Sequence, residues 1–287
     1  HGGITVIGNK CLCKVKSPCL NTLDYNRIYI LSTDCTIFSE STYLFKFIQN
    51  YRHFIAYQRY KICRIRIADF TASVKHNGFN DIRGGGHFSG RLTLTLVAAG
   101  VVAKKIASGV TFSASITQIA GVSDSAQWEN ILDAALAEGD SVGGIVECVC
   151  TGVPAGLGEP FFDSLESDIA HLAFSIPGVR GIEFGDGFAA AAMKGSQHND
   201  CFVDAHGHTA TNGAGGINGG ISNGNPVVFR IAVKPTSSIS KIQNTFNFRT
   251  GEVEEFSVKG RHDACIALRC PVIVEAIAAI AIAQHIL

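Results

Sequence analysis

Residues 110–116 read Val-Thr-Phe-Ser-Ala-Ser-Ile, and their alternation of apolar and small polar side chains predicts a strand with one buried face. From here to residue 184 the chain alternates between helical and extended patterns. A helix is expected over Ser125–Ala137, because Asp124 is a suitable N-cap and Gly139 follows its end. Further elements are predicted at 144–151 (strand), 163–174 (helix) and 179–184 (strand). This order predicts a domain in which helices are layered on sheets.

The flanking segments extend the same pattern. A glycine run, Arg83-Gly84-Gly85-Gly86, leads into a helix predicted over Arg91–Ala107, where apolar residues recur at helical spacing. Residues 195–225 are polar and rich in glycine, and we expect one long loop of a kind that is usually functional. After it the sequence predicts a strand over Val227–Val233 and a hairpin that turns at Thr250-Gly251. The last stretch, Pro271–Leu287, predicts a buried helix that starts at its proline.

The average composition is that of a globular chain without bulk charge. The 287 residues suffice for one large domain or two small ones, and 46% are hydrophobic against 17% charged. Because 24 basic residues balance 24 acidic ones, the average favours neither nucleic acid nor an anionic membrane as a partner. The longest apolar stretch, Ala276–Ala283, is too short to span a bilayer, and no export signal is expected. Ten cysteines in such a chain do not indicate a disulfide scaffold, so we expect a reducing, cytoplasmic setting.

This average hides a break in composition near residue 67. All six tyrosines and five of the ten cysteines precede the break, and Gly8 is the single glycine between Ile4 and Asn77. Ten basic and three acidic residues give residues 1–66 a formal charge of +7, which leaves −7 for the remainder. We therefore divide the chain into an atypical basic, Tyr/Cys-rich segment, 1–66, and a domain, 67–287. The first segment has three possible interpretations: a nucleic-acid arm, a divergent subdomain, or text that is non-native or out of frame.

Two segments have the residue types of an anion site. Around the glycine run, Arg83, His87, Ser89 and Arg91 combine cations and a hydroxyl with free backbone N–H groups, which suits a phosphate or a carboxylate. Lys234-Pro235-Thr236-Ser237-Ser238 places a cation and three hydroxyls directly after a strand. Each segment taken alone is also compatible with a solvated surface turn.

Two other clusters suggest different chemistry. Arg261-His262-Asp263 follows Gly260, and in an extended segment Arg261 and Asp263 share one face. The long loop carries a set of residue types that bind zinc or iron, although ligand-rich loops also arise by chance. That set is His198, Asp200, Cys201, Asp204, His206 and His208.

Residues 83–91, Arg-Gly-Gly-Gly-His-Phe-Ser-Gly-Arg, resemble the glycine-rich signature of the chorismate synthase family. Further matches follow in family order and bring the resemblance to residues 68–287, about three quarters of the chain. They are Val97-Ala98-Ala99-Gly100, Ala103-Lys104-Lys105, Gly185-Asp186-Gly187-Phe188, residues 215–224, Lys234–Ile239, Gly260–Asp263 and Pro271–Ala276.

The resemblance implies an α+β fold, a β-α-β sandwich in which helices are layered with antiparallel sheets, assembled as a homotetramer. It also implies a lyase that converts 5-enolpyruvylshikimate 3-phosphate to chorismate and phosphate by 1,4-elimination, the last step of the shikimate pathway and part of aromatic amino acid biosynthesis. The implied cofactor is reduced FMN (FMNH2), supplied by an external NAD(P)H-dependent reductase. We expect a cytoplasmic flavoprotein with no nucleic-acid or membrane partner and no metal.

Site residues follow from the same resemblance, position by position. His1 and Asp263 match catalytic positions, and Arg83 and Arg91 match substrate-binding arginines. Flavin contacts match the following residues: His87, Phe88, Ser89, Gly219, Lys234, Pro235, Thr236, Ser237, Ser238 and Arg261. The usual family text has Arg-Ser-Ser-Ala-Arg at residues 87–91, and proline where this chain has Ala264.

The front of the chain departs from the family pattern. His1-Gly2 matches the end of a Gly-Glu-Ser-His-Gly motif, but nothing between Ile4 and Arg66 resembles the arginine-rich segment that binds substrate. Ile67 stands where the family has its second catalytic histidine, and isoleucine cannot donate a proton. We therefore expect residues 3–67 to be out of frame and activity to be impaired. The alternatives are an inactive FMN-binding relic and a metal-binding loop protein.

Overall fold

The computed structural model describes residues 4–7, 10–14, 29–31, 36–38, 69–81, 85–248, 250–260 and 262–287. The chain forms two compact units. The smaller unit comprises His1–Cys63, Phe70–Asn80 and Asn247–Gly251, and the larger comprises Arg64–Asp69, Asp81–Phe246 and Glu252–Leu287. The division expected between residues 66 and 67 stays a prediction, as do the three interpretations of residues 1–66.

The smaller unit contains a four-stranded antiparallel sheet in which each strand pairs with the next. Its strands are β1 (Ile4–Ile7), β2 (Lys10–Lys14), β3 (Tyr29–Leu31) and β4 (Thr36–Phe38). The unit also holds most of helix α2 (Asp69–Lys75), whose Phe70 ring stacks on Phe248 with 5.5 Å between ring centroids. The sequence patterns predicted none of these short strands.

The larger unit is built on one antiparallel sheet with the strand order β5-β6-β10-β7. The strands are β5 (Thr111–Ile119), β6 (Gly144–Thr151), β10 (Val227–Val233) and β7 (Val179–Phe184). Alternation decides which face is buried: Val146, Cys148 and Cys150 are buried, while the intervening Glu147 and Val149 stay partly exposed. The β5 strand runs three residues beyond the predicted 110–116, through an irregularity between Ile116 and Gln118.

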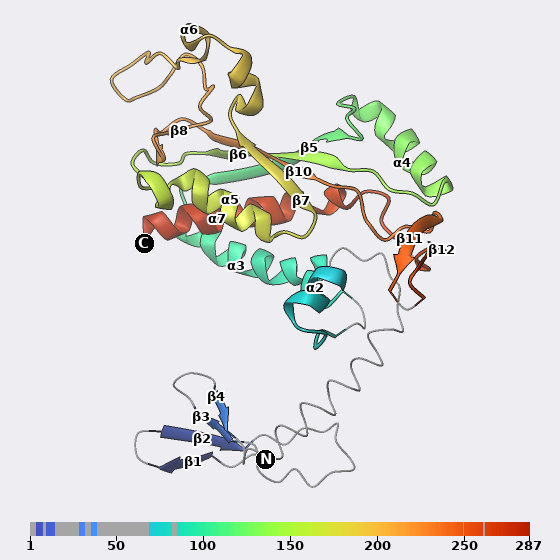
Figure 1. The fold of residues 1–287 in the computed structure, drawn as a ribbon. Coiled ribbons are helices and arrows are strands. Elements are labelled where there is room, and N and C mark those ends of the chain that lie inside the picture. The colour runs from blue at the N-terminus through green and yellow to red at the C-terminus, as the bar shows by residue number, and fades with distance from the viewer. Residues whose placement is uncertain are drawn as a thin grey trace. The chain divides into compact units, whose positions relative to one another are not determined.

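Three helices lie on the same side of this sheet (Figure 1). Helices α5 (Leu165–Ser175) and α7 (Pro271–Ile286) pack against its strands, and α3 (Thr93–Ile106) packs against α7. The expected buried helix is confirmed, since α7 begins at Pro271 and nine of its residues, Ile277 among them, are buried. The antiparallel sheet and its helical layers confirm the α+β class.

The contact between α3 and α7 is very close because Gly100 has no side chain. A Cβ atom at Gly100 would lie 2.4 Å from the Cβ of Ala276. One turn further along, Ala103 clusters with Ala279 and Ala283. The two helices therefore run in the same direction, and the residues before α3 lie toward the end of the sheet from which α7 starts.

The remaining elements surround this core. A 3₁₀ turn (Ser125–Gln127) leads into α4 (Trp128–Ala137), and the predicted cap is confirmed: the Asp124 carboxylate accepts a hydrogen bond from the Ala126 N–H at 3.1 Å. A hairpin turning at 250–251, as predicted, joins β11 (Gln243–Asn247) to β12 (Glu252–Phe256). Further 3₁₀ turns are Gly86–Phe88, Gly90–Leu92, Phe161–Asp163, Gly187–Ala192 and Ile266–Arg269.

The expectation of one unstructured loop over 195–225 was wrong. This segment contains α6 (Gly195–His198) and a hairpin of two very short strands, β8 (Ile217–Asn218) and β9 (Ile221–Ser222). Two-residue strands leave no alternation in a sequence, which is why the pattern missed them. Among the described residues, no helix has both the length and the apolar character that a membrane crossing needs.

Candidate functional site

The segment Lys234–Ser238 leaves the sheet at the end of β10 and forms a compact cationic turn. The Lys234 N–H donates to the Gly178 carbonyl at 2.9 Å, which fixes the start of the segment beside β7. The Lys234 ammonium group donates to the hydroxyl of Ser237, three residues further along the chain, with 3.1 Å between Nζ and Oγ. A positive charge and a hydroxyl group thus converge within four residues, as the sequence predicted for an anion site.

Thr236 lies between these two residues and is bonded on one side only. Its carbonyl oxygen accepts a hydrogen bond from the Ser141 hydroxyl at 2.7 Å. Its own Oγ1 atom is buried and, within the part of the chain that the structure describes, has no hydrogen-bond partner. A buried hydroxyl without a partner costs about 1–3 kcal/mol, so this position favours a ligand or water that would bond it.

Asp263 is held from the following 3₁₀ turn. Arg269 donates from Nη2 to Asp263 Oδ1 at 2.6 Å, and the backbone carbonyl of the next residue, Ala264, accepts from the Val142 N–H at 2.7 Å. Asp263 lines an open cavity of about 570 Å³ between α4 and the segment 262–269. The cavity is lined by Glu129, Leu132, Asp133, Leu136, His262, Asp263, Ala264, Cys265, Leu268 and Arg269.

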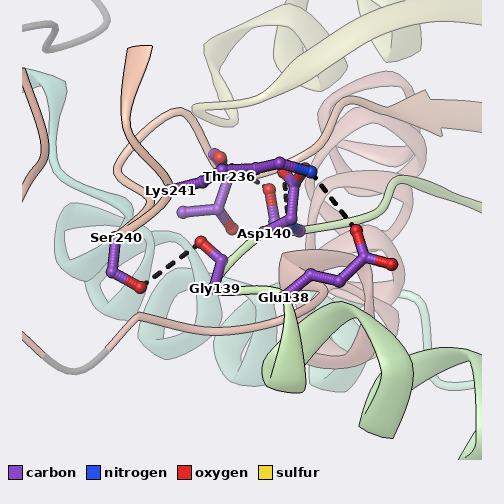
Figure 2. A network of polar contacts seen from close by, with 7 residues as sticks. Glu138, Gly139, Asp140, Thr236, Ser240 and Lys241 are labelled. Carbon is purple, nitrogen blue, oxygen red and sulfur yellow. Dashed lines mark hydrogen bonds and ion pairs between the residues drawn. The ribbon is translucent and has the colours of Figure 1, made fainter. Parts of the chain in front are cut away.

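The connection from α4 to β6 binds both of these segments. Figure 2 shows its Glu138, Gly139 and Asp140 in contact with Ser240 and Lys241, which lie just beyond the cationic turn. Lys241 donates from Nζ to Asp140 at 2.9 Å and to Glu138 at 3.2 Å. The bond from Lys241, together with one from the Ser141 N–H, holds the pKa of Asp140 below its ordinary value.

The residues that precede α3 have exposed side chains or partly exposed ones. His87 is exposed, Phe88 is 46% exposed, and the Ser89 hydroxyl accepts from the Arg91 N–H at 3.3 Å to start the next 3₁₀ turn. Because α3 runs alongside α7, this segment lies toward the same end of the sheet as Lys234 and Asp263. The structure thus brings three of the predicted segments to one end of the sheet.

Gly219 is the exception among the predicted flavin contacts. It sits in the turn of the β8–β9 hairpin with φ of +61°, a conformation that favours glycine. The Leu165 N–H donates to the Gly220 carbonyl at 2.9 Å, and the Val228 N–H donates to the Gly215 carbonyl at 3.1 Å, so the hairpin lies where β10 begins. Lys234 follows the last residue of β10, and a seven-residue strand spans about 23 Å. Within one copy of the chain, Gly219 and Lys234 therefore lie at opposite ends of the sheet.

Three predicted site residues lie outside the described residues: His1, Arg83 and Arg261. Their assignments stay predictions.

The candidate metal loop uses its carboxylates to hold its own fold. Asp200 accepts hydrogen bonds from Thr211 and from the N–H groups of Gly213 and Ala214. His208 bonds Asp204 at 2.5 Å and lowers the pKa of that carboxyl group. In the described parts of the chain, no group of three or more His, Cys, Asp or Glu residues is arranged to hold a metal ion. This arrangement does not support the metal-binding alternative.

Sequence reasoning missed the residues that connect the site segments. Ser141 and Lys241 bond partners that are 95 and 101 positions away in the chain, and Arg269 was not singled out. The only signal was the position of Asp140-Ser141 between a helix end and a strand, where polar side chains are common.

Comparisons with known proteins point to one family. The family model described as chorismate synthase matches residues 40–287. A chorismate synthase from Chitinophaga pinensis is 65% identical over 221 residues, which cover 77% of this chain and 66% of that protein. One from Korarchaeum cryptofilum is 43% identical over 248 residues, with 77% and 69% covered. The chain thus spans about two thirds of the length of these relatives.

The structural comparison agrees with the sequence comparisons. A crystal structure of chorismate synthase aligns with a TM-score of 0.58 and 25% sequence identity, over 75% of this chain and 68% of that one. The family match starts at residue 40, ahead of residue 68, where the motif resemblance begins.

Proposed function

The chain belongs to the chorismate synthase family, and we propose that it is a lyase that converts 5-enolpyruvylshikimate 3-phosphate to chorismate and phosphate in aromatic amino acid biosynthesis. The observation that carries this proposal is the cationic turn Lys234–Ser238, with its buried, unpartnered Thr236 hydroxyl, at the same end of the sheet as Asp263. The substrate carries a phosphate and two carboxylates, so its site must supply fixed cations and hydrogen-bond donors.

The residues present fit reduced FMN as the cofactor. A phosphate monoester needs a cation and several donors, which Lys234, Thr236 and Ser237 provide in one turn. His87, Phe88 and Ser89 supply exposed groups at the same end of the sheet, where a flavin ring would need contacts. When bound, reduced flavin supplies electron density to the reacting system while phosphate leaves, with no net redox change. We propose that an external NAD(P)H-dependent reductase provides the reduced form.

The protein's own groups bind the anion and take up a proton in the proposed reaction. A C–O bond to phosphate and a ring C–H bond break, a C=C bond forms, and the products are chorismate, phosphate and a proton. Arg91 neutralises part of the substrate charge, with Arg83 as the further predicted substrate cation, while Lys234 and Arg261 are the predicted cations of the flavin site. We assign to Asp263 the role of holding or accepting the proton, because Arg269 fixes its carboxylate through Oδ1 and leaves Oδ2 available to a ligand.

This assignment of the flavin site requires contact between copies of the chain, and we propose that the chain assembles as a homotetramer. Gly219 lies beside the start of β10 and Lys234 follows its end, a strand length of about 23 Å, so in the proposed site Gly219 contacts the flavin from a second copy of the chain. We propose that assembly brings the Gly219 turn of one copy to the cationic turn of another. The proposed setting is the cytoplasm, with no nucleic-acid or membrane partner.

Two features of the sequence predict that this exact chain is slow or inactive. Ile67 replaces the second family histidine, and residues 3–67 lack the arginine-rich segment. Translation of the underlying DNA in the other two frames tests the second point: we expect one frame to yield an arginine-rich segment that ends in Pro-Gly-His. If neither frame does, residues 3–67 are a divergent subdomain instead.

A chimera separates the function of the domain from the defect at its front. In it, residues 1–66 are replaced by the corresponding part of the Chitinophaga pinensis relative, and Ile67→His is added. Chorismate formation is then measured anaerobically with reduced FMN. We expect flavin binding in both proteins, turnover in the chimera, and little or none in the original chain. Flavin binding without turnover in the chimera would favour the relic, and the absence of both would exclude the proposed function.

A further inference from the structure

We propose that the connection from α4 to β6, residues 138–142, positions both halves of the site, and that Ser141 is its central positioning residue. The inference rests on the proposed function, because it concerns how the chain holds the phosphate group of the flavin. Ser141 itself makes no contact with a ligand in this scheme; it acts through Thr236.

The connection holds the loop 234–241, which contains the cationic turn, at three points. The Ser141 hydroxyl donates to the Thr236 carbonyl at 2.7 Å, in the middle of the turn. The Gly139 carbonyl accepts from the N–H groups of Ser240 at 3.1 Å and Lys241 at 3.0 Å, just beyond the turn. Figure 2 shows Gly139 beside Ser240, and Glu138 and Asp140 beside Lys241, so that one short segment closes the end of the loop 234–241.

The same connection also holds the segment that carries Asp263, the proposed catalytic residue. The Val142 N–H donates to the Ala264 carbonyl at 2.7 Å, one residue after Asp263. The glycines that follow have no space for side chains: a Cβ at Gly143 would lie 2.6 Å from the Val233 carbonyl oxygen, and one at Gly144 2.9 Å from Ala267 Cβ. The connection therefore packs tightly between the end of β10 and the segment before α7. It fixes the distance between these two segments.

Ser141 is itself held in place. The Asp140 carboxylate accepts from the Ser141 N–H at 2.9 Å through one oxygen and from Lys241 at 2.9 Å through the other. The position of the Ser141 hydroxyl therefore depends on an ion pair at the far end of the loop it bonds. This ring of hydrogen bonds orders the loop before a ligand binds, so that ligand binding does not carry the entropic cost of ordering it.

The loss of this order should appear as weaker binding of the flavin phosphate. Without the Ser141 hydroxyl, the Thr236 peptide loses its anchor and the three donors of the turn lose their common orientation. One lost hydrogen bond of this kind corresponds to about a tenfold change in an equilibrium constant. We expect Ser141→Ala to raise the Kd for FMN by that factor. In the chimera, the same change should lower kcat by a smaller factor than it raises the FMN concentration needed for half-maximal activity.

The experiment titrates oxidised FMN against the full chain and follows the quenching of flavin fluorescence. Four variants are compared with the original chain: Ser141→Ala, Ser141→Thr, Lys241→Met and the control Ser175→Ala. The control removes a hydroxyl that likewise donates to a backbone carbonyl, that of Leu172 at 2.6 Å, but this bond lies within α5 and does not hold the loop 234–241. Hydrogen exchange of the peptide that covers 234–241 is measured in the same proteins.

The expected pattern is specific. Ser141→Ala weakens FMN binding about tenfold and speeds exchange over 234–241, Ser141→Thr restores both, and Ser175→Ala changes neither. Lys241→Met removes an exposed ion pair, keeps the fold, and weakens binding about two- to fivefold. Unchanged binding and exchange in both Ser141→Ala and Lys241→Met overturn the inference. If the original chain and the chimera both fail to bind FMN, the proposed function itself has failed.

Discussion

Gly100→Ala tests whether the close α3–α7 contact is as tight as the structure shows. In an exposed helix, this change stabilises by about 1 kcal/mol, since glycine is a poor helix former. Here the new Cβ would lie 2.4 Å from Ala276 Cβ and 2.7 Å from Ala276 Cα, well inside ordinary van der Waals contact. The helices must therefore separate by about 1 Å, and overpacking of this kind costs about 1–3 kcal/mol. We expect a net loss of up to about 2 kcal/mol, the opposite sign to that given by helix propensity alone.

The measurement is urea unfolding of the full chain, followed by far-UV circular dichroism. Gly109→Ala serves as the control, because nothing lies within 4 Å of its would-be Cβ and its stability should hardly change. Ala276→Gly in the Gly100→Ala background removes the shorter of the two contacts, that with Ala276 Cβ, and should recover part of the loss, so that the two changes are not additive. A Gly100→Ala protein as stable as the original would show that the helices are not packed as described.

Three further predictions concern charged side chains. Glu275→Ala leaves the Ala114 N–H of the sheet edge without its acceptor and should lower the free energy of unfolding by about 1–3 kcal/mol, whereas Glu275→Gln should lower it less. Lys241→Met should raise the pKa of Asp140 toward its ordinary value of 3.8 in an NMR titration, because the bond from Lys241 that lowers this pKa is lost. In the original chain the lowered pKa stabilises the fold above that pH, and this stabilisation is lost as the pH falls through the lower folded value. Arg269→Gln should leave the urea midpoint nearly unchanged, because an exposed ion pair is worth about 0–1 kcal/mol, yet lower kcat of the chimera; an unchanged kcat would remove Arg269 from the site.

The parts of the fold that follow a regular period were predictable. The strand over 179–184 and the helix from Pro271 appear where the pattern placed them, because alternation and apolar runs directly record which face is buried. The helix expected over 125–137 begins as a 3₁₀ turn, a difference at its boundary only. The β8–β9 hairpin could not be predicted, since a two-residue strand carries no period.

The site was predictable as segments but not as an arrangement. The cationic turn and Asp263 were identified by residue type and by family resemblance, both of which are local properties of the sequence. Ser141 was missed because its role depends on a hydrogen bond to Thr236, 95 positions away. No local pattern records such a pairing, which becomes visible only when the strands have been placed next to each other.

The antiparallel order of the sheet explains which predicted residues can share a site. In such an order, β5 and β10 end at the edge where β6 and β7 begin, as the pairing of Val233 with Gly144 and with Val179 shows. Segments that follow β10 or precede β6 and β7 must therefore meet there, and the cationic turn and residues 138–142 do so. Gly219 falls at the other end of the sheet, because hydrogen bonds from the Leu165 and Val228 N–H groups to the Gly220 and Gly215 carbonyls hold its hairpin beside the start of β10. The proposed flavin contact from Gly219 is therefore argued across two copies of the chain, so the proposed assembly and the proposed site depend on each other.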